Sequence, residues 1–192
     1  NDMVLALSEI KNKVQKAFIK NNIKDYEKGK TLIAFEVVKR AITTLIKNEI
    51  KDIELGNEIE IISLEKKIEC NLKLEELKHS VKLRGIIDRL DKRNGTVRII
   101  DYKTGLIKPN EVTIKGISSC FDVSHLKSMQ LLCYALMYFK NNPECVNLEA
   151  GLISFRDLNK GLMKFGIKES SNTLNHRIDS IKIKEFEKAI KN

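Results

Sequence analysis

The chain has 192 residues, of which 42% are hydrophobic and 32% are charged, which suits one domain with a substantial core. Its net charge of +9 favours a polyanionic partner, most simply nucleic acid, although a lysine-rich composition alone gives the same charge. No run of about 18 apolar residues occurs, so the sequence predicts no membrane-spanning helix. We therefore expect no membrane partner.

Apolar residues at spacings of three and four predict two amphipathic helices at the start of the chain. The first covers about residues 2–20, with Ile10 and Val14 in its apolar stripe. The second covers about residues 31–51. Its predicted inner stripe consists of Ile33, Val37, Val38, Ala41, Leu45 and Ile46. We expect residues 1–56 to form the helical N-terminal part of a single domain, residues 1–192.

From Glu58 the apolar spacing changes to that of a strand, which continues to about Ile68. Two apolar, β-branched runs then flank Asn94-Gly95, the sequence typical of a two-residue hairpin turn. The hairpin is expected over residues 81–104. If the turn has two residues, Arg93 faces Thr96, and the register continues along both strands.

A long loop is predicted over residues 106–124, and a loop of this length usually has a function or is disordered. Ser124 is the expected N-cap of a helix that ends near Lys140. Strands over residues 147–155 and 161–167 and a last helix over residues 182–191 follow. With a sheet core at residues 58–168, this order predicts an α/β fold, a central mixed β-sheet flanked by helices.

The hairpin register places Asp88 opposite Asp101. Facing residues of a sheet have Cβ atoms about 4.5–5.5 Å apart, so two facing carboxylates repel each other unless a positive charge lies between them. Lys103 is two residues beyond Asp101 and points to the same face. The same register sets Asp91 opposite Arg98, an opposite-charge pair.

Two such carboxylates can hold Mg²⁺, with waters and substrate phosphates completing the octahedron. The backbone carbonyl of Tyr102 could add a third oxygen ligand. Lys103 would then lie beside the metal-bound water and offset charge on a phosphodiester. The pattern predicts metal-assisted hydrolysis of a nucleic acid backbone, with Asp88, Asp101 and Lys103 as catalytic residues. The alternative is a solvated strand end, since Asp-x-Lys is common by chance.

Further residues could complete this site. Gln130 and Tyr134 are four apart on one helix face, where either could bind Lys103 or a phosphate, unless they are only the edge of an amphipathic helix. Arg89 and Lys108 could contact DNA phosphates, although surface cations are abundant. Glu65 could point toward the site from the preceding strand.

The four cysteines, Cys70, Cys120, Cys133 and Cys145, include no C-x-x-C pair. They are interpreted as reduced, mostly buried thiols.

The segments GIIDRLD and IIDYKTG and the Q-x-x-x-Y spacing from Gln130 to Tyr134 resemble, in this order, the PD-(D/E)xK nuclease superfamily. The nearest likeness is to the RecB/AddB-type nuclease domain of bacterial helicase–nucleases. The resemblance implies a restriction-endonuclease-like core. It assigns Asp88 and Asp101 to the metal and Lys103 to catalysis, and it places Gln130 and Tyr134 beside the DNA.

The resemblance also implies Mg²⁺ or Mn²⁺ as cofactor, exonuclease-like action on DNA in recombination and repair, a helicase subunit or domain as partner, and a cytoplasmic, nucleoid-associated location in a bacterium. Relatives have a metal-binding histidine on an earlier helix. The first two predicted helices have none, which suggests a fragment of a larger protein.

Some relatives also bind an iron–sulfur cluster through four cysteines. The cysteines here do not match that arrangement, so a cluster is not supported. The alternative function is a catalytically incomplete DNA-binding or scaffolding module of a repair complex. Cleavage of RNA is also open.

Overall fold

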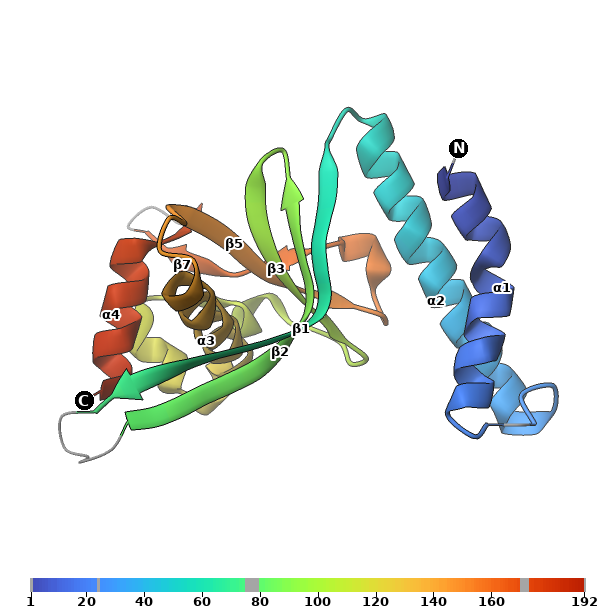
Figure 1. Ribbon diagram of the computed structural model, residues 1–192, viewed down its shortest axis with the longest axis horizontal. Helices are drawn as coiled ribbons and strands as arrows, with labels where there is room; N and C mark the ends of the chain where they lie inside the picture. Colours follow the sequence, from blue (N-terminus) through green and yellow to red (C-terminus); the bar gives the residue numbers. More distant parts are fainter. Residues whose placement is uncertain (1, 24, 75–79, 170–172, 192) are drawn as a thin grey trace. The chain divides into compact units, whose positions relative to one another are not determined.

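The computed structural model describes residues 2–23, 25–74, 80–169 and 173–191 (Figure 1). The chain divides into two compact units, Asn1–Asn57 and Glu58–Asn192. The assignment of residues 1–192 to one domain stays a prediction. Within the described ranges, no helix is both long enough and apolar enough to cross a membrane.

The first unit consists of two helices, α1 (Asp2–Lys20) and α2 (Gly29–Glu54). Both helices were predicted from their apolar spacing. Their shared core contains Ile10, Val14, Phe18 and Phe35. The Phe18 and Phe35 rings meet edge to face, with centroids 5.3 Å apart.

The predicted inner stripe of α2 is wrong in part. Ile33 and Val37 are 66% and 61% exposed, whereas Phe35 is 4% exposed. The reason is that α1 covers only one face of α2, the face that carries Phe35 and the partly buried Ile42 and Ile46. Apolar residues occur around more of α2 than a single neighbouring helix can bury.

The second unit is built on a mixed sheet. Its strands are β1 (Ile59–Lys73), β2 (Ser80–Arg93), β3 (Thr96–Lys103), β5 (Asn147–Ser154), β6 (Met163–Lys164) and β9 (Ile178–Asp179). The order is β1-β2-β3-β5-β6, and β9 also pairs with β5. The β3–β5 pair is parallel and the other pairs are antiparallel.

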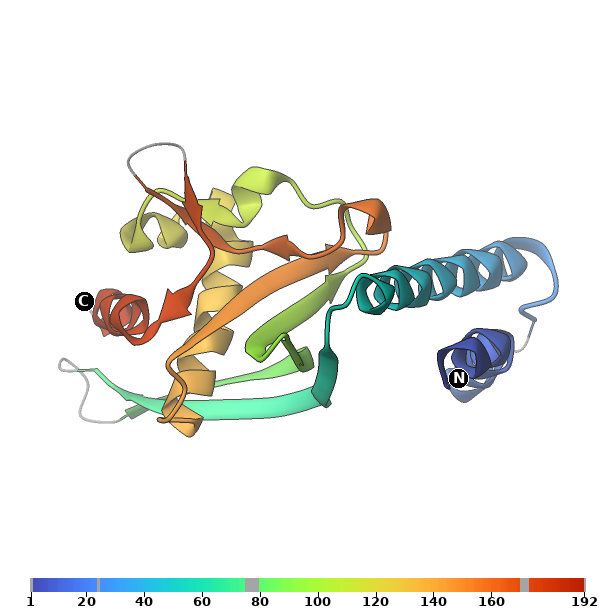
Figure 2. The ribbon, with the colours of Figure 1, turned by 90° about the horizontal axis from the view of Figure 1, so that it is seen from above.

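Helix α3 (Leu126–Asn141) lies in the chain between the parallel strands β3 and β5 and packs on the sheet, and α4 (Ser180–Lys191) packs beside α3 (Figure 2). The fully buried Leu90, Ile99 and Leu132 belong to the core between the sheet and these helices. This arrangement confirms the expected α/β class with a restriction-endonuclease-like core.

The predicted loop before α3 contains short elements. They are the 3₁₀ turns η1 (Pro109–Glu111), η2 (Ile117–Phe121) and η3 (Val123–His125) and strand β4 (Thr113–Ile114). The Ser124 N-cap prediction is wrong, because Ser124 lies inside η3. The N-cap of α3 is His125, which makes no side-chain capping bond.

The strand predicted over residues 161–167 is also wrong as a single element. It divides into β6, in the main sheet, and β7 (Gly166–Lys168), which joins β4 and β8 (Leu174–Asn175) in a small second sheet. The fully buried Phe165 lies between β6 and β7, and its side chain fixes the chain where it leaves one sheet for the other. The 3₁₀ turn η4 (Leu158–Lys160) precedes β6.

Candidate active site

The β2–β3 hairpin has the predicted register, with Arg93 paired to Thr96, Asp91 to Arg98 and Arg89 to Ile100. Asn94 and Gly95 form the turn with φ angles of 50° and 79°. Positive φ at both central positions is what a two-residue hairpin turn requires, and Asn-Gly supplies it at low cost. The turn sequence therefore fixes which residues meet at the other end of the hairpin.

That other end holds the two predicted carboxylates. The regular ladder stops at the Arg89–Ile100 pair, one step before Asp88 and Asp101 would pair. Asp88 instead accepts a hydrogen bond at Oδ2 from the backbone N–H of Tyr102, 2.7 Å away. Asp88 is half-buried and Asp101 is 4% exposed. The carboxylates therefore lie close together where the hairpin opens.

Lys103 and Gln130 hold Asp101 in a closed network. The Lys103 Nζ lies 2.8 Å from Asp101 Oδ2 and donates to Gln130 Oε1 over 2.9 Å. The Gln130 Nε2 donates to Asp101 Oδ1 at 2.9 Å and to the Tyr134 hydroxyl at 3.0 Å. These contacts use both N–H groups of the Gln130 amide, so its orientation is fixed. The structure thus brings Asp88, Asp101, Lys103, Gln130 and Tyr134 together.

The network contains more negative than positive charge when both carboxyl groups are ionised. Burial raises the pKa of Asp101, and the charge of Asp88 adds to this effect, while Lys103 and Gln130 oppose it. The buried Asp101 Oδ2 makes an ion pair with Lys103 but no well-formed hydrogen bond. A divalent cation would supply the missing positive charge.

The donor set fits a hard cation such as Mg²⁺, which is typically held by one or two carboxylates while waters and phosphates complete its shell. Among the described residues there is no group of three or more histidine, cysteine, aspartate or glutamate side chains placed to hold a metal. Glu65, considered above, is exposed, and its φ is 50°. It does not join the two aspartates in such a group.

The two predicted DNA-contacting cations have different surroundings. Lys108 is exposed at the start of η1. Arg89 is 4% exposed, and its Nε donates to Asp91 Oδ2 at 2.7 Å inside the sheet. Its position argues against a phosphate contact, because reaching one would break a buried ion pair. The sequence shows only that Arg89 is charged, and the fold is needed to show that its partner is Asp91.

Gly85 packs against the candidate site, and we did not single it out from the sequence. A Cβ built at Gly85 would lie 2.8 Å from Cε1 of Tyr134 and 3.3 Å from Cε of Met137. The glycine therefore allows α3 to approach β2 closely enough for Tyr134 to reach Gln130. Its place at the start of the G-x-x-D-R segment was the available signal.

Ser154 was also missed. It pairs with Lys103 across the parallel β3–β5 ladder, and its buried hydroxyl donates to the Gly105 carbonyl at 2.8 Å. Phe155 adds a backbone bond to the Lys103 carbonyl at 2.9 Å. Together they fix the backbone that carries the lysine. A lone serine at a strand end gives no such signal in sequence.

The cysteines are free thiols in partly or fully buried positions. Burial raises the pKa of Cys120 and of Cys133 to about 11. Thiols with so high a pKa are unreactive at neutral pH, because the thiolate is the nucleophile.

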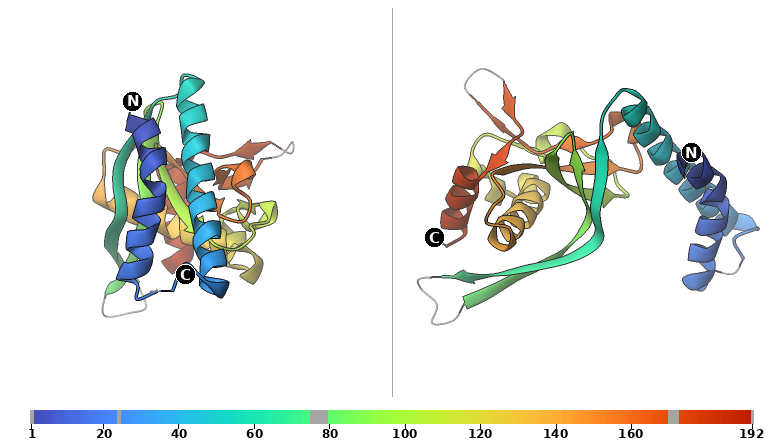
Figure 3. Two further views of the ribbon diagram at one scale, coloured as in Figure 1. Left: turned by 90° about the vertical axis from the view of Figure 1, so that its right-hand side faces the viewer. Right: turned by 45° about the horizontal axis from the view of Figure 1, so that its top comes forward.

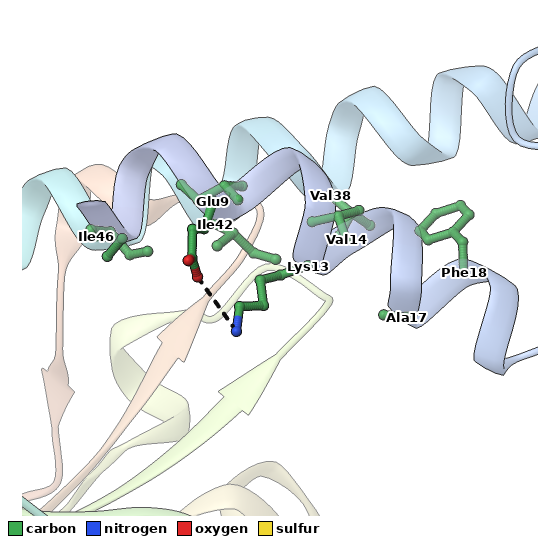
Figure 4. Close-up of a pocket in the computed structure, with 10 residues that line it drawn as sticks. Glu9, Lys13, Val14, Ala17, Phe18, Val38, Ile42 and Ile46 are labelled. Atoms are coloured by element: carbon green, nitrogen blue, oxygen red, sulfur yellow. Dashed lines mark ion pairs between the residues drawn. The ribbon is translucent and has the colours of Figure 1, made fainter. Parts of the chain in front are cut away.

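The helical unit contains an apolar hollow. It lies between α1 and α2, has a volume of about 330 Å³ and is lined by residues including Val14, Val38 and Ile42 (Figure 4). The Glu9–Lys13 ion pair, 3.4 Å long, lies at its edge. Its lining is apolar except at this edge, so it lacks the chemistry of the Asp88–Asp101 site.

The family model of the PD-(D/E)XK nuclease superfamily matches residues 4–190 of the chain. No curated protein matches it. The matched residues include most of both units, the α1–α2 pair and the sheet unit that holds the carboxylates.

Proposed function

The chain belongs to the PD-(D/E)XK nuclease superfamily, and from this membership we propose that it is a metal-dependent deoxyribonuclease domain that hydrolyses phosphodiester bonds. One observation carries the proposal. Asp88, Asp101 and Lys103 converge at the open end of a hairpin, and Gln130 bonds both Asp101 and Lys103. A site needed only for stability would not place two carboxylates beside one ammonium group.

In this proposal Asp88 and Asp101 hold Mg²⁺ or Mn²⁺, with the Tyr102 carbonyl as a further oxygen ligand. When bound, such an ion would polarise the phosphoryl oxygen and lower the pKa of its bound water. Lys103 orients the attacking water and neutralises charge that develops on the phosphate. Gln130 holds the side chains of Lys103 and Asp101 in place, and the Tyr134 hydroxyl accepts a hydrogen bond from the Gln130 amide. Lys108, exposed on the following loop, binds the DNA backbone.

The wider setting follows from the motif likeness described above. We propose that the domain acts in DNA recombination and repair in the bacterial cytoplasm. Its action there is exonuclease-like, and its partner is a helicase subunit or domain.

Cleavage of labelled DNA tests the enzymatic proposal. With Mg²⁺ or Mn²⁺, the wild-type chain should cleave, and Lys103→Ala should be about 10²–10⁴-fold slower, the range typical of a removed proton-transfer or orienting group. Lys92→Ala is the matched control, since Lys92 lies on the same hairpin and pairs with Glu60 at the surface. Cleavage by Lys103→Ala at the wild-type rate would contradict the assignment of Lys103 as a catalytic residue.

A second candidate is a DNA-binding or scaffolding module that does not cut. It is favoured by the observation that the described residues bring only two carboxylates together at the site. Such a module would bind DNA with a strong salt dependence, ignore Mn²⁺ and show no cleavage at any metal concentration.

A further inference from the structure

Beyond the active site, β1 and β2 continue as a two-stranded ribbon. Strand β3 pairs with Arg89–Arg93 of β2, whereas β1 pairs with β2 as far as Lys73 and Ser80. The ribbon extends away from the other strands and passes α3 (Figure 3, right). Two-stranded ribbons are marginal on their own, so this one depends on what its faces contact.

One face of the ribbon has an evident structural partner. The cross-strand pairs Ile68–Gly85, Cys70–Leu83 and Leu72–Val81 alternate with the pairs of the other face. Ile68 and Leu72 are buried in the main core, and Gly85 lies against Tyr134 of α3. This inner face accounts for the stability of the ribbon.

The opposite face, called here the outer face, is exposed and positively charged. It consists of the paired positions Lys67–Ile86, Glu69–Arg84, Asn71–Lys82 and Lys73–Ser80. Four of these eight positions carry a cation and one carries a carboxylate. All eight are exposed.

The outer-face charges are largely uncompensated within the described residues. Lys82 Nζ lies 2.9 Å from Glu69 Oε1, but these side chains are 55% and 59% exposed, and such pairs contribute little. Lys67, Lys73 and Arg84 form no ion pair with any residue that the structure describes. Glu69 is the single carboxylate among these positions, so most of the positive charge of this face is not offset within it.

We propose that the outer face binds the phosphate backbone of DNA, an inference that rests on the proposed function. Arg84 is four residues before Asp88 on β2, which limits the distance between them to about 13 Å along the strand. From Lys67 to Lys73 the face is about 20 Å long, which corresponds to about six nucleotide steps of one strand. On β2 the cations of Lys82 and Arg84 are about 7 Å apart, whereas those of Lys67 and Lys73 lie at the two ends of the β1 part of the face.

A salt series of DNA-binding measurements tests this inference with the full chain. The probe is a fluorescent DNA oligonucleotide, measured by anisotropy in Ca²⁺ so that binding is separated from cleavage. The variant replaces Lys67, Lys73, Lys82 and Arg84 with Gln. Each lost phosphate contact flattens the slope of log K against log salt by about 0.7–0.9. We expect the slope to flatten by about 2 or more and affinity to fall at least about tenfold.

Two controls separate the ribbon from net charge and from misfolding. The first control removes the same number of charges from exposed positions of α1 and α2, by replacing Lys11, Lys16, Lys47 and Lys51 with Gln. It should change the slope less. Replacing Lys67, Lys73 and Lys82 with Arg and Arg84 with Lys keeps the charge and should bind like the wild type.

The inference is overturned if the ribbon Gln variant binds DNA as the wild type does, or loses no more than the α1–α2 control. It is also overturned if only an RNA oligonucleotide of the same sequence loses affinity. Failure of the proposed function looks different, because a wild-type chain that never cleaves could still show ribbon-dependent binding. Conversely, suppose that cleavage depends on Lys103 while the ribbon substitutions leave DNA binding unchanged. That result would contradict the ribbon inference and leave the proposed function standing.

Discussion

Two buried aspartates of the β2–β3 hairpin, Asp91 and Asp101, lie on opposite faces of the sheet and have opposite charge environments. Asp91 accepts from the Nε of Arg98 at 2.7 Å and from the Nε of Arg89 at 2.7 Å, so two cations surround one carboxylate. Asp101, by contrast, has as neighbours the ammonium group of Lys103, the amide of Gln130 and a second carboxylate, that of Asp88.

The difference separates a structural cluster from the proposed metal site. At Asp91 the protein itself compensates the buried charge. At Asp101 it does not, and the surplus negative charge is where a divalent cation would bind.

Loss of the structural carboxylate should have the largest effect on stability. Asp91→Asn leaves the guanidinium groups of Arg89 and Arg98, which are 4% and 8% exposed, without their anion. Removing one partner of a buried pair costs about 3–5 kcal/mol. Urea unfolding followed by circular dichroism measures this cost. A midpoint equal to that of the wild type contradicts the structural role.

The same substitution on the other face should leave the fold intact. Asp101→Asn removes a carboxylate whose pKa is already raised by burial and by Asp88, so the free energy of unfolding should change little. Cleavage should fall by about 10²-fold or more, as when one preorganised electrostatic group is lost. A variant that unfolds as easily as Asp91→Asn while keeping its activity would reverse the comparison.

Gly85→Ala tests the packing that supports the functional cluster. The new methyl group would collide with the Tyr134 ring at 2.8 Å, so the helix must shift at a cost of about 1–3 kcal/mol. Because Tyr134 holds Gln130, cleavage should fall as well. Gly105→Ala is the matched control near the same site, since a Cβ there meets nothing within 4 Å. Equal thermal midpoints for the two variants argue against the close approach.

The smallest expected effect concerns pH and the loop before α3. The backbone N–H of Lys108, and secondarily Lys127, hold the pKa of Glu111 below its ordinary value of 4.5. A lowered folded-state pKa means that this stabilisation is present above the unfolded value and is lost as the pH falls through the folded value. Urea unfolding from pH 7 to about pH 3 should therefore show a shallower loss for Glu111→Gln. An identical pH dependence for both proteins excludes the contribution.

The sequence was sufficient for features encoded locally. Asn94-Gly95 fixes the hairpin register because few other residues tolerate positive φ at both turn positions. The register in turn brings Asp88 near Asp101, and helical spacing places Gln130 and Tyr134 on one face.

Features that depend on distant partners were not predictable in this way. Arg89 looks like a surface cation until the fold pairs it with Asp91. The importance of Gly85 depends on how closely α3 approaches, and the division of residues 161–167 depends on where Phe165 is buried. Each of these outcomes is set by tertiary packing.

The central claim is that Asp88 and Asp101 together bind a divalent cation, and calorimetric titration with Mn²⁺ tests it most directly. The account predicts a saturable binding heat for the wild type, its loss in the Asp88→Asn/Asp101→Asn double variant, and no change in Asp122→Asn, which alters an exposed carboxylate. Binding by the double variant with wild-type affinity and stoichiometry would contradict the account.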